Sequence, residues 1–265
     1  MAARAAPESL SVDRHGAVAV VTFRRPDQLN AISTPMMAEI TEAFLGLGRD
    51  PEVNVIVLTG EGRGFMAGAD IKEYAGQADS AFDDFQTRGR AMYAAIEDNP
   101  KPVIAAVNGY ALGGGFEMVL CCDIVLASSK AKMGLPEVKL GLVPGGGGTQ
   151  RGVARLGANR AAYLLLTGAM LPAATFADYG LVAELTEPDD LMPRALALAG
   201  ELATASPDAI RELKTLVHFA TRNELPAGLD REGEAVRSLF RTDFAKARVR
   251  EFAEKSAARE REKRG

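Results

Sequence analysis

The chain has 265 residues, of which 47% are hydrophobic and 25% are charged. A composition this apolar can bury a large core, which argues against intrinsic disorder. Lys and Arg number 31 against 35 Asp and Glu, so the net charge is −4 and the chain as a whole does not attract nucleic acid or an anionic membrane. The length suits one large domain or two small ones.

Two features of the sequence bear on where the protein works. Its two cysteines, Cys121 and Cys122, are adjacent, which suits neither a disulfide framework nor a metal cluster and indicates a reducing compartment. No apolar run approaches the ~20 residues needed to cross a bilayer. Met1–Pro7 lacks the apolar stretch of a secretory signal, with a short organellar presequence as the alternative. We therefore expect a cytoplasmic protein that does not span a membrane.

The first part of the chain alternates between short β-branched runs and segments with helical spacing. Such alternation predicts an α/β architecture with crossover connections. The predicted strands, all expected to be buried, are Val18–Phe23, Val53–Thr59, Val103–Val107, Ile124–Ala127 and Leu181–Leu185. The predicted helices are Pro35–Leu47 (with Thr34 as its N-cap), Phe82–Ile96 and Ala158–Thr167.

From about Asp189 onward the pattern is helical and contains no convincing strand. Pro207 and Pro226 mark helix starts or breaks in this part. The helices predicted here are Leu191–Ala203, Pro207–Thr221 and Arg231–Phe252. We therefore predict an α/β domain over residues 1–200 and a helical C-terminal region over residues 201–265.

Glycine is concentrated in three segments, Gly60–Ile71, Asn108–Glu117 and Gly141–Gln150. Each could be a plain turn, because glycine supplies the positive φ of a sharp bend. Two features favour a ligand site instead. The first two segments directly follow predicted strands, where α/β folds gather their sites. Gly113–Gly115 also open a helix directly, and unpaired N–H groups at a helix start can approach a developing negative oxygen. No GxxxxGK[ST] phosphate loop occurs, and Gly60–Gly64 lacks the GxGxxG spacing.

The ionisable residues narrow the chemistry further. His15 and His218 are the only histidines, and no Ser or Cys lies in a GxSxG-type context, which disfavours a serine-type triad. Glu117 falls one turn into the helix that the glycines open, and Glu137 lies in another apolar stretch. A carboxylate among apolar side chains is costly to bury unless it is paired or functional. Sequence spacing alone leaves both a surface or ion-paired role and a shared catalytic pocket open for the two glutamates.

Three longer segments together resemble the enoyl-CoA hydratases of the crotonase superfamily, and the resemblance extends from about residue 10 to residue 256. They are Phe65–Glu73, Lys101–Glu117 and Leu135–Arg151. The resemblance implies a ββα spiral core and a helical C-terminal region that forms trimer contacts, with dimers of trimers common in the family. It also implies acyl-CoA thioesters as substrates, with no metal and no cofactor beyond the coenzyme A of the substrate.

The activity implied by the resemblance is reversible syn addition of water to a 2-enoyl-CoA, which gives a 3-hydroxyacyl-CoA. By similarity, Ala69 and Gly114 supply the two backbone N–H groups of an oxyanion hole. Glu117 is expected to deprotonate the water that attacks C3, and Glu137 to deliver a proton to C2. The substrate-binding and CoA-binding residues implied in the same way are Leu29, Ala31, Ala67, Asp70, Ile71, Lys72 and Gly113.

Some alternatives stay open at this point. Phe116 stands where many short-chain hydratases carry a small residue, so the acyl preference is not set. The superfamily supports several acyl-CoA reactions, and a double-bond isomerase, a crotonobetainyl-CoA hydratase or a lyase is the alternative activity. An RNA-binding platform is a third class, which the acidic balance and the absence of a lysine-rich helix disfavour.

Overall fold

The computed structural model describes residues 9–73, 75–76 and 78–262, and the chain divides into two compact units, Met1–Thr204 and Ala205–Gly265. Met1–Pro7, where the sequence shows no secretory signal, lies outside the described residues. Within the described part, every helix is too short or too polar to cross a membrane.

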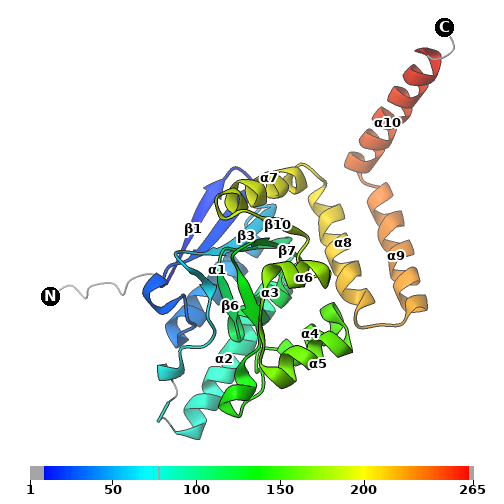
Figure 1. Ribbon diagram of the computed structural model, residues 1–265. Helices are drawn as coiled ribbons and strands as arrows, with labels where there is room; N and C mark the ends of the chain where they lie inside the picture. Colours follow the sequence, from blue (N-terminus) through cyan, green and yellow to red (C-terminus); the bar gives the residue numbers. More distant parts are fainter. Residues whose placement is uncertain (1–8, 74, 77, 263–265) are drawn as a thin grey trace. The chain divides into compact units, whose positions relative to one another are not determined.

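The larger sheet of the first unit has the strand order β1-β2-β3-β5-β7-β10 in the part of the chain described (Figure 1). β1 pairs antiparallel with β2, and every other neighbouring pair is parallel. The strands are β1 (Leu10–His15), β2 (Val18–Phe23), β3 (Val55–Gly60), β5 (Val103–Val107), β7 (Ile124–Ser128) and β10 (Glu184–Thr186). The expected α/β architecture is confirmed, whereas β1 was not predicted, because most of its side chains are exposed and it lacks an apolar run.

The central strands of this sheet are buried on both faces, as their continuous apolar runs predict. Along β2, Ala19 and Val21 join one hydrophobic cluster, which includes Ile40 and Phe44 from α1. The alternate residues, Val18 and Val20, join a second cluster with side chains of α7. Because successive side chains point to opposite faces of a strand, a run without polar residues requires helices on both sides of the sheet.

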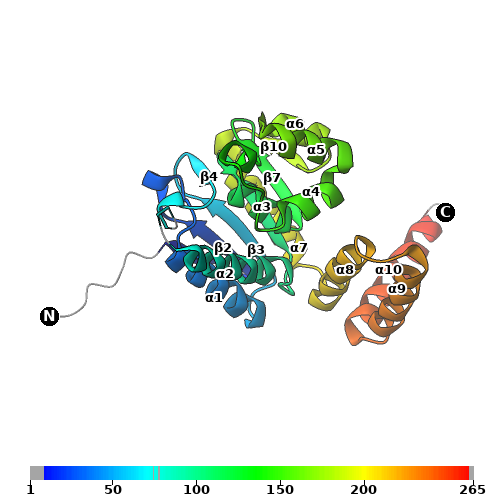
Figure 2. The same cartoon turned by 90° about the horizontal axis from the view of Figure 1, so that it is seen from below.

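Helices surround this sheet, and α1 and α2 lie side by side (Figure 2). The helices of the first unit are η1 (Pro26–Gln28), α1 (Thr34–Arg49), η2 (Ile71–Glu73), α2 (Asp79–Glu97), α3 (Gly114–Cys121), η3 (Glu137–Leu140), α4 (Gly148–Leu156), α5 (Ala158–Thr167), α6 (Ala173–Asp178), η4 (Pro188–Asp190) and α7 (Leu191–Ala203). The predicted N-cap of α1 is wrong by one residue. Ser33 is the cap, because its Oγ accepts a hydrogen bond from the Met36 amide (3.4 Å).

A second, smaller sheet carries the glycine segments. Its order is β4-β6-β8-β9 in the described structure, with strands β4 (Gly64–Met66), β6 (Tyr110–Leu112), β8 (Lys132–Gly134) and β9 (Met170–Pro172). β6, which was not predicted from the sequence, lies between the Asn108–Gly109 pair and α3. Strands of three residues are too short for a periodic pattern to indicate them.

The predicted strand Leu181–Leu185 is also displaced, because β10 spans only Glu184–Thr186. Leu181 and Val182 are buried in the core as expected. They lie in the turn that follows α6, and both of their amides donate to the carbonyl of Phe176 within that helix. Their hydrogen bonds close this turn, and pairing with β7 begins only at Glu184.

The second unit is helical, with α8 (Pro207–Ala220), α9 (Leu225–Phe240) and α10 (Asp243–Glu262). Pro207 and Pro226 lie in the first turns of α8 and α9, as predicted. The continuous helix predicted over Arg231–Phe252 is wrong. The chain breaks it near Thr242, whose Oγ1 accepts a hydrogen bond from the Ala245 amide (3.2 Å) and caps α10.

Candidate active site

A cavity of about 200 Å³ in the first unit brings residues of all three glycine segments together. Of the residues expected at the site, seven line it: Ala67, Ala69, Ile71, Gly113, Gly114, Glu117 and Glu137. The other four, Leu29, Ala31, Asp70 and Lys72, are not among its described lining residues. A larger hollow of about 530 Å³ runs along α1 and α2, but its one carboxylate, Glu42, is exposed. The smaller cavity is therefore the candidate active site.

The amide of Ala69 faces this cavity because its neighbours are tied to Ile32. The Ile32 amide donates to the Gly68 carbonyl (2.8 Å), and the Asp70 amide donates to the Ile32 carbonyl (2.8 Å). The Ala69 amide itself donates no hydrogen bond to any residue that the structure describes. A backbone donor held in place and left without a partner is suited to bind a substrate oxygen.

The second backbone donor is Gly114, the first residue of α3. Gly113 precedes it with φ +52°, and the Gly113 amide donates to the Gly134 carbonyl of β8 (2.9 Å). Like Ala69, the Gly114 amide has no acceptor within the described structure, and it lies at the positive end of a helix. A β-carbon built on Gly114 would lie 3.8 Å from the Ala69 nitrogen, so the two donors are close together.

Glu117 lies one turn further along α3 and is 3% exposed. Its Oε1 accepts hydrogen bonds from the amides of Gly146 (2.8 Å) and Gly148 (2.7 Å). Gly148 begins α4, so the carboxylate occupies the N-terminus of a second helix. Its Oε2 has no hydrogen-bond partner among the residues described, which leaves that oxygen for a substrate or water.

Glu137 begins the short helix η3 and faces the start of α3. A β-carbon built on Gly113 would lie 3.0 Å from its Oε1, so only a glycine at that position lets the carboxyl approach this closely. Its Oε2 is buried, without a hydrogen-bond partner in the part of the chain described. A buried, unpaired carboxyl oxygen is unusual and indicates a functional group.

Both carboxyls are harder to ionise than exposed glutamates. Burial raises the pKa of Glu117 to about 7, and the nearby charge of Glu137 acts in the same direction. The hydrogen bonds from Gly148 and Gly146 and the charge of Arg151 oppose this shift. Burial also raises the pKa of Glu137. Acidic groups with raised pKa values in one cavity are suited to proton transfer near neutral pH.

Two residues at this site were not predicted from the sequence. Tyr93 of α2 lines the cavity, and its hydroxyl donates to the Gly114 carbonyl (3.0 Å). Arg151 of α4 is outside the described cavity lining, and its Nη1 donates to the Gly146 carbonyl (2.6 Å). Tyrosines are common on the buried faces of helices, so no sequence signal distinguished Tyr93. Arg151 lies within a segment that resembles the family, but the sequence assigns it no role.

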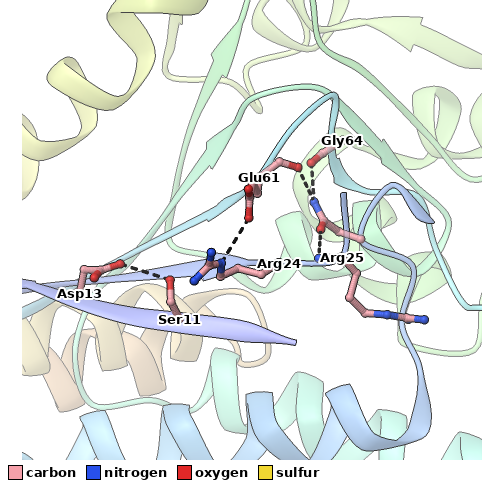
Figure 3. Close-up of polar contacts among 7 residues, drawn as sticks. Ser11, Asp13, Arg24, Arg25, Glu61 and Gly64 are labelled. Carbon is pink, nitrogen blue, oxygen red and sulfur yellow. Dashed lines mark hydrogen bonds and ion pairs between the residues drawn. The ribbon is translucent and has the colours of Figure 1, made fainter. Parts of the chain in front are cut away.

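The predicted CoA-binding turn, which holds Leu29 and Ala31, contributes neither residue to the described lining of the cavity. The turn is tied to β4 and the residue after it, because the side-chain Nδ2 of Asn30 donates to the Gly64 carbonyl (2.8 Å) and the Ala67 amide donates to the Leu29 carbonyl (3.0 Å). Figure 3 shows Gly64 and, near it, the ion pair between Arg24 and Glu61 (3.3 Å).

The predicted residues Ala31, Asp70 and Lys72 are arranged around this turn. Arg25 bonds the carbonyl of Ala31 and forms an ion pair with Asp70 (3.1 Å). Lys72 is exposed, and Ile71 is 48% exposed although it also lines the cavity. The turn and the segment after Ala69 are thus joined by backbone and ionic contacts.

Phe116 is not among the described residues that line the cavity. This side chain is fully buried and packs on Phe176, with ring centroids 5.0 Å apart. Apolar side chains from α2, from the end of η3 and from the segment after it also line the cavity: Phe82, Phe85, Leu140, Leu142 and Val143. Among the described residues, no three His, Cys, Asp or Glu side chains are grouped as metal ligands.

The sequence is similar to known proteins over nearly its whole length. It matches the profile of the family Enoyl-CoA hydratase/isomerase over residues 13–262. It is 39% identical to a probable enoyl-CoA hydratase, echA8, of Mycobacterium tuberculosis, covering 94% of this chain and 96% of that protein. It is 35% identical to a crotonyl-CoA hydratase of Syntrophomonas wolfei, with 95% and 97% covered.

The fold has solved counterparts as well. A crystal structure of an enoyl-CoA hydratase from Bacillus anthracis superimposes with a TM-score of 0.90 at 33% identity, covering 93% of this chain and 96% of that one. These similarities confirm the fold and the superfamily expected from the sequence, and they support the expected hydratase activity. The chain belongs to the enoyl-CoA hydratase/isomerase family, within the crotonase superfamily.

Proposed function

We propose that this protein is a hydro-lyase that adds water reversibly, in the syn sense, to the 2,3 double bond of a 2-enoyl-CoA thioester and so forms a 3-hydroxyacyl-CoA. One observation carries this proposal: Ala69 and Gly114, whose amides have no partner among the described residues, line the same cavity as the carboxyls of Glu117 and Glu137. The similarity to proteins named as hydratases supports it.

The backbone donors would polarise the thioester. Attack of water at C3 places negative charge on the thioester oxygen, and the Ala69 and Gly114 amides would bind that oxygen. One preorganised donor of this kind is typically worth ~3–4 kcal/mol in the transition state. Gly114 gains further from its position at the start of α3.

The two carboxyls would divide the proton transfers. Glu117, as carboxylate, would use its unpaired Oε2 to take a proton from the water that attacks C3. Glu137, in its neutral form, would deliver a proton to C2. The raised pKa of each carboxyl supports these roles, because both ionised and neutral forms are then accessible near neutral pH. The same steps in reverse give dehydration.

The remaining predicted residues would hold the substrate. Ala67, Ile71 and Gly113 line the cavity and would contact the acyl-thioester portion. We assign the coenzyme A portion to the turn and segment outside the cavity, which hold Leu29, Ala31, Asp70 and Lys72. The reaction requires no group beyond the coenzyme A of the substrate, because the chain's own amides and carboxyls supply each step.

We also propose that the helical C-terminal region, placed at residues 201–265 from the sequence, joins subunits in a trimer or a dimer of trimers. The second unit exposes many large apolar side chains, which single soluble domains rarely do. Those that are more than half exposed are Leu213, Val217, Leu225, Leu229, Val236, Phe240, Val249 and Phe252. A cytoplasmic location stays a prediction from the two adjacent cysteines.

The activity is tested with the purified full chain, without added metal, on crotonyl-CoA and a longer 2-enoyl-CoA. The enoyl-thioester absorbance should fall, and the product should gain the mass of one water. Glu117→Gln and Glu137→Gln should each slow turnover by more than about tenfold. Glu184→Gln, remote from the cavity, is the control. An active wild type whose two glutamine variants keep its rate would refute the mechanism, and a product of unchanged mass would indicate isomerisation.

A further inference from the structure

The backbone of Gly146 is hydrogen-bonded to two side chains of opposite charge. Its N–H donates to Glu117 (2.8 Å), and its carbonyl accepts a hydrogen bond from Nη1 of Arg151 (2.6 Å). Arg151 is not among the described cavity-lining residues. In the described structure its side chain makes no hydrogen bond to Glu117, but it bonds the carbonyl of Gly146, the residue whose N–H donates to that carboxylate.

Arg151 is itself held by Glu97, the last residue of α2. The guanidinium and the carboxylate form two hydrogen bonds, Nε to Oε1 (3.0 Å) and Nη2 to Oε2 (2.6 Å). The exposed fractions of the two side chains are only 21% for Arg151 and 15% for Glu97. Bidentate Arg–carboxylate pairs fix orientation as well as charge, so Glu97 aims the guanidinium at Gly146.

The same face of α2 holds Gly146 a second time. Tyr93 lies four residues before Glu97, which places both on one side of the helix. A β-carbon built on Gly146 would lie 2.1 Å from Cε2 of Tyr93, so the ring packs directly against this peptide. Gly146 is thus confined between the Tyr93 ring, the Arg151 guanidinium and the Glu117 carboxylate.

Arg151 differs in the sign of its charge from the other titratable groups around Glu117. The titratable groups that face Glu117 are Glu137 from η3, Tyr93 from α2, Arg151 from α4 and Cys121 from its own helix. In the described structure, Arg151 is the one cation among them. Burial is the largest single influence and opposes its charge, but the hydrogen bonds to Glu97 and the nearby acidic groups together outweigh burial and raise the pKa of Arg151, so it stays protonated.

We propose that Glu97 and Arg151 are positioning residues for Glu117: they hold the Gly146–Gly148 backbone so that its two amides keep the carboxylate in place for catalysis. This inference rests on the proposed hydratase function. Loss of the pair would let the loop move, and a displacement of about 1 Å at a catalytic group can cost 100-fold in rate.

The test compares Arg151→Gln, Arg151→Lys and Glu97→Gln with the wild type, by kcat, KM and the pH profile of kcat/KM. Arg151→Gln should lower kcat about 10- to 100-fold, with little change in KM, since Arg151 does not line the cavity. It should also move the acidic limb of the profile to higher pH, because a cation that favours ionised Glu117 is gone. Arg151→Lys keeps the positive charge but loses the planar guanidinium that makes two hydrogen bonds to Glu97. We therefore expect kcat to fall, while the acidic limb of the pH profile stays near its wild-type position. Glu97→Gln preserves the shape of the side chain and should lower kcat in the same direction as Arg151→Lys.

A matched control exists elsewhere in the first unit. Arg194 and Glu184 form the same bidentate pair, with bonds of 2.6 and 2.7 Å, between α7 and β10. Glu184→Gln should leave kcat and the pH limb unchanged. A kcat within twofold of wild type in all three test variants, or an unmoved limb in Arg151→Gln, would overturn the inference.

A measurement without substrate separates this inference from the proposed function. The infrared carboxyl band that disappears in Glu117→Gln reports the protonation of Glu117, and its titration midpoint should rise in Arg151→Gln. A raised midpoint in a chain that hydrates no enoyl-CoA would support the positioning of Glu117 and overturn the hydratase. An unchanged midpoint in an active enzyme would overturn the inference alone.

Discussion

Glu117 accepts a 2.7 Å hydrogen bond from the amide of Gly148, the residue at which α4 begins. The proposed general base is therefore fixed between two helices, because it extends from the first turn of α3 and occupies the N-terminus of α4. The dipole of α4 favours the ionised carboxylate, whereas burial favours the neutral acid. Burial is the larger influence, since the pKa of Glu117 is raised to about 7.

Stability should depend on pH through this residue. The folded protein holds the Glu117 proton with a pKa of about 7, above the ordinary value of 4.5 for an exposed glutamate. Folded chains thus bind more protons than unfolded chains between these values, and stability falls as pH rises through this range. Relative to Glu117→Gln, which cannot titrate, the wild type should lose about 3 kcal/mol of unfolding free energy between pH 4.5 and 7.

Urea unfolding of both proteins at pH 4.5 and pH 8, at one protein concentration, measures this difference. The shift of Glu137 is present in both proteins and largely cancels. Equal pH dependence in the two proteins would show that Glu117 is not the buried acid described above.

Gly114→Ala should abolish most of the activity without unfolding the chain. The new methyl group would lie 2.7 Å from the Tyr93 hydroxyl oxygen and 3.1 Å from Cδ1 of Ile32, and it would point toward the Ala69 amide. It would therefore fill the space proposed for the thioester oxygen. We expect kcat to fall about 100-fold or more, the cost of losing one oxyanion donor.

Gly200→Ala in α7 is the matched control, because a β-carbon there meets nothing within 4 Å. It should keep full activity and gain up to about 1 kcal/mol of stability from the better helix propensity of alanine. Thermal unfolding checks that both variants fold. Normal turnover by a folded Gly114→Ala would contradict the assigned donor pair.

Acyl-chain preference should respond to Leu142 and not to Phe116. Leu142 lines the cavity, whereas Phe116 packs on Phe176 in the core. Leu142→Ala removes apolar contact worth about 0.8 kcal/mol per buried CH₂, so the ratio of kcat/KM for a C8 over a C4 enoyl-CoA should change several-fold. Phe116→Leu should lower stability by about 1–3 kcal/mol and keep that ratio. The opposite pattern would place the acyl chain against Phe116.

The sequence was most informative where a local pattern coincides with a structural requirement. The glycines before α3 predicted its start and the one-turn offset to Glu117, because both are local. Glu137 was singled out by its apolar surroundings, but only the family resemblance joined it and Ala69 to Glu117 in one site, because no spacing rule connects them. The structure brings all of them to one cavity.

Features that depend on tertiary contacts were missed. Glu97 and Arg151 are 54 residues apart, and their pairing follows from the packing of α2 near α4, not from any pattern along the chain. The break between α9 and α10 was missed because the helical period continues across it. Only the cap by Thr242 marks it, and a lone threonine inside a helical pattern is a weak signal.

The donor pair at residues 69 and 114 belongs to the main chain, held by the hydrogen bonds of Ile32 and by the first turn of α3. Exchange of a side chain cannot delete a peptide N–H, except by proline, although a methyl group added at Gly114 can block access to it. The acid–base half consists of two ordinary side chains that single substitutions can replace. A scaffold divided in this way can acquire new chemistry on the same class of thioester while it keeps its means of activating the carbonyl.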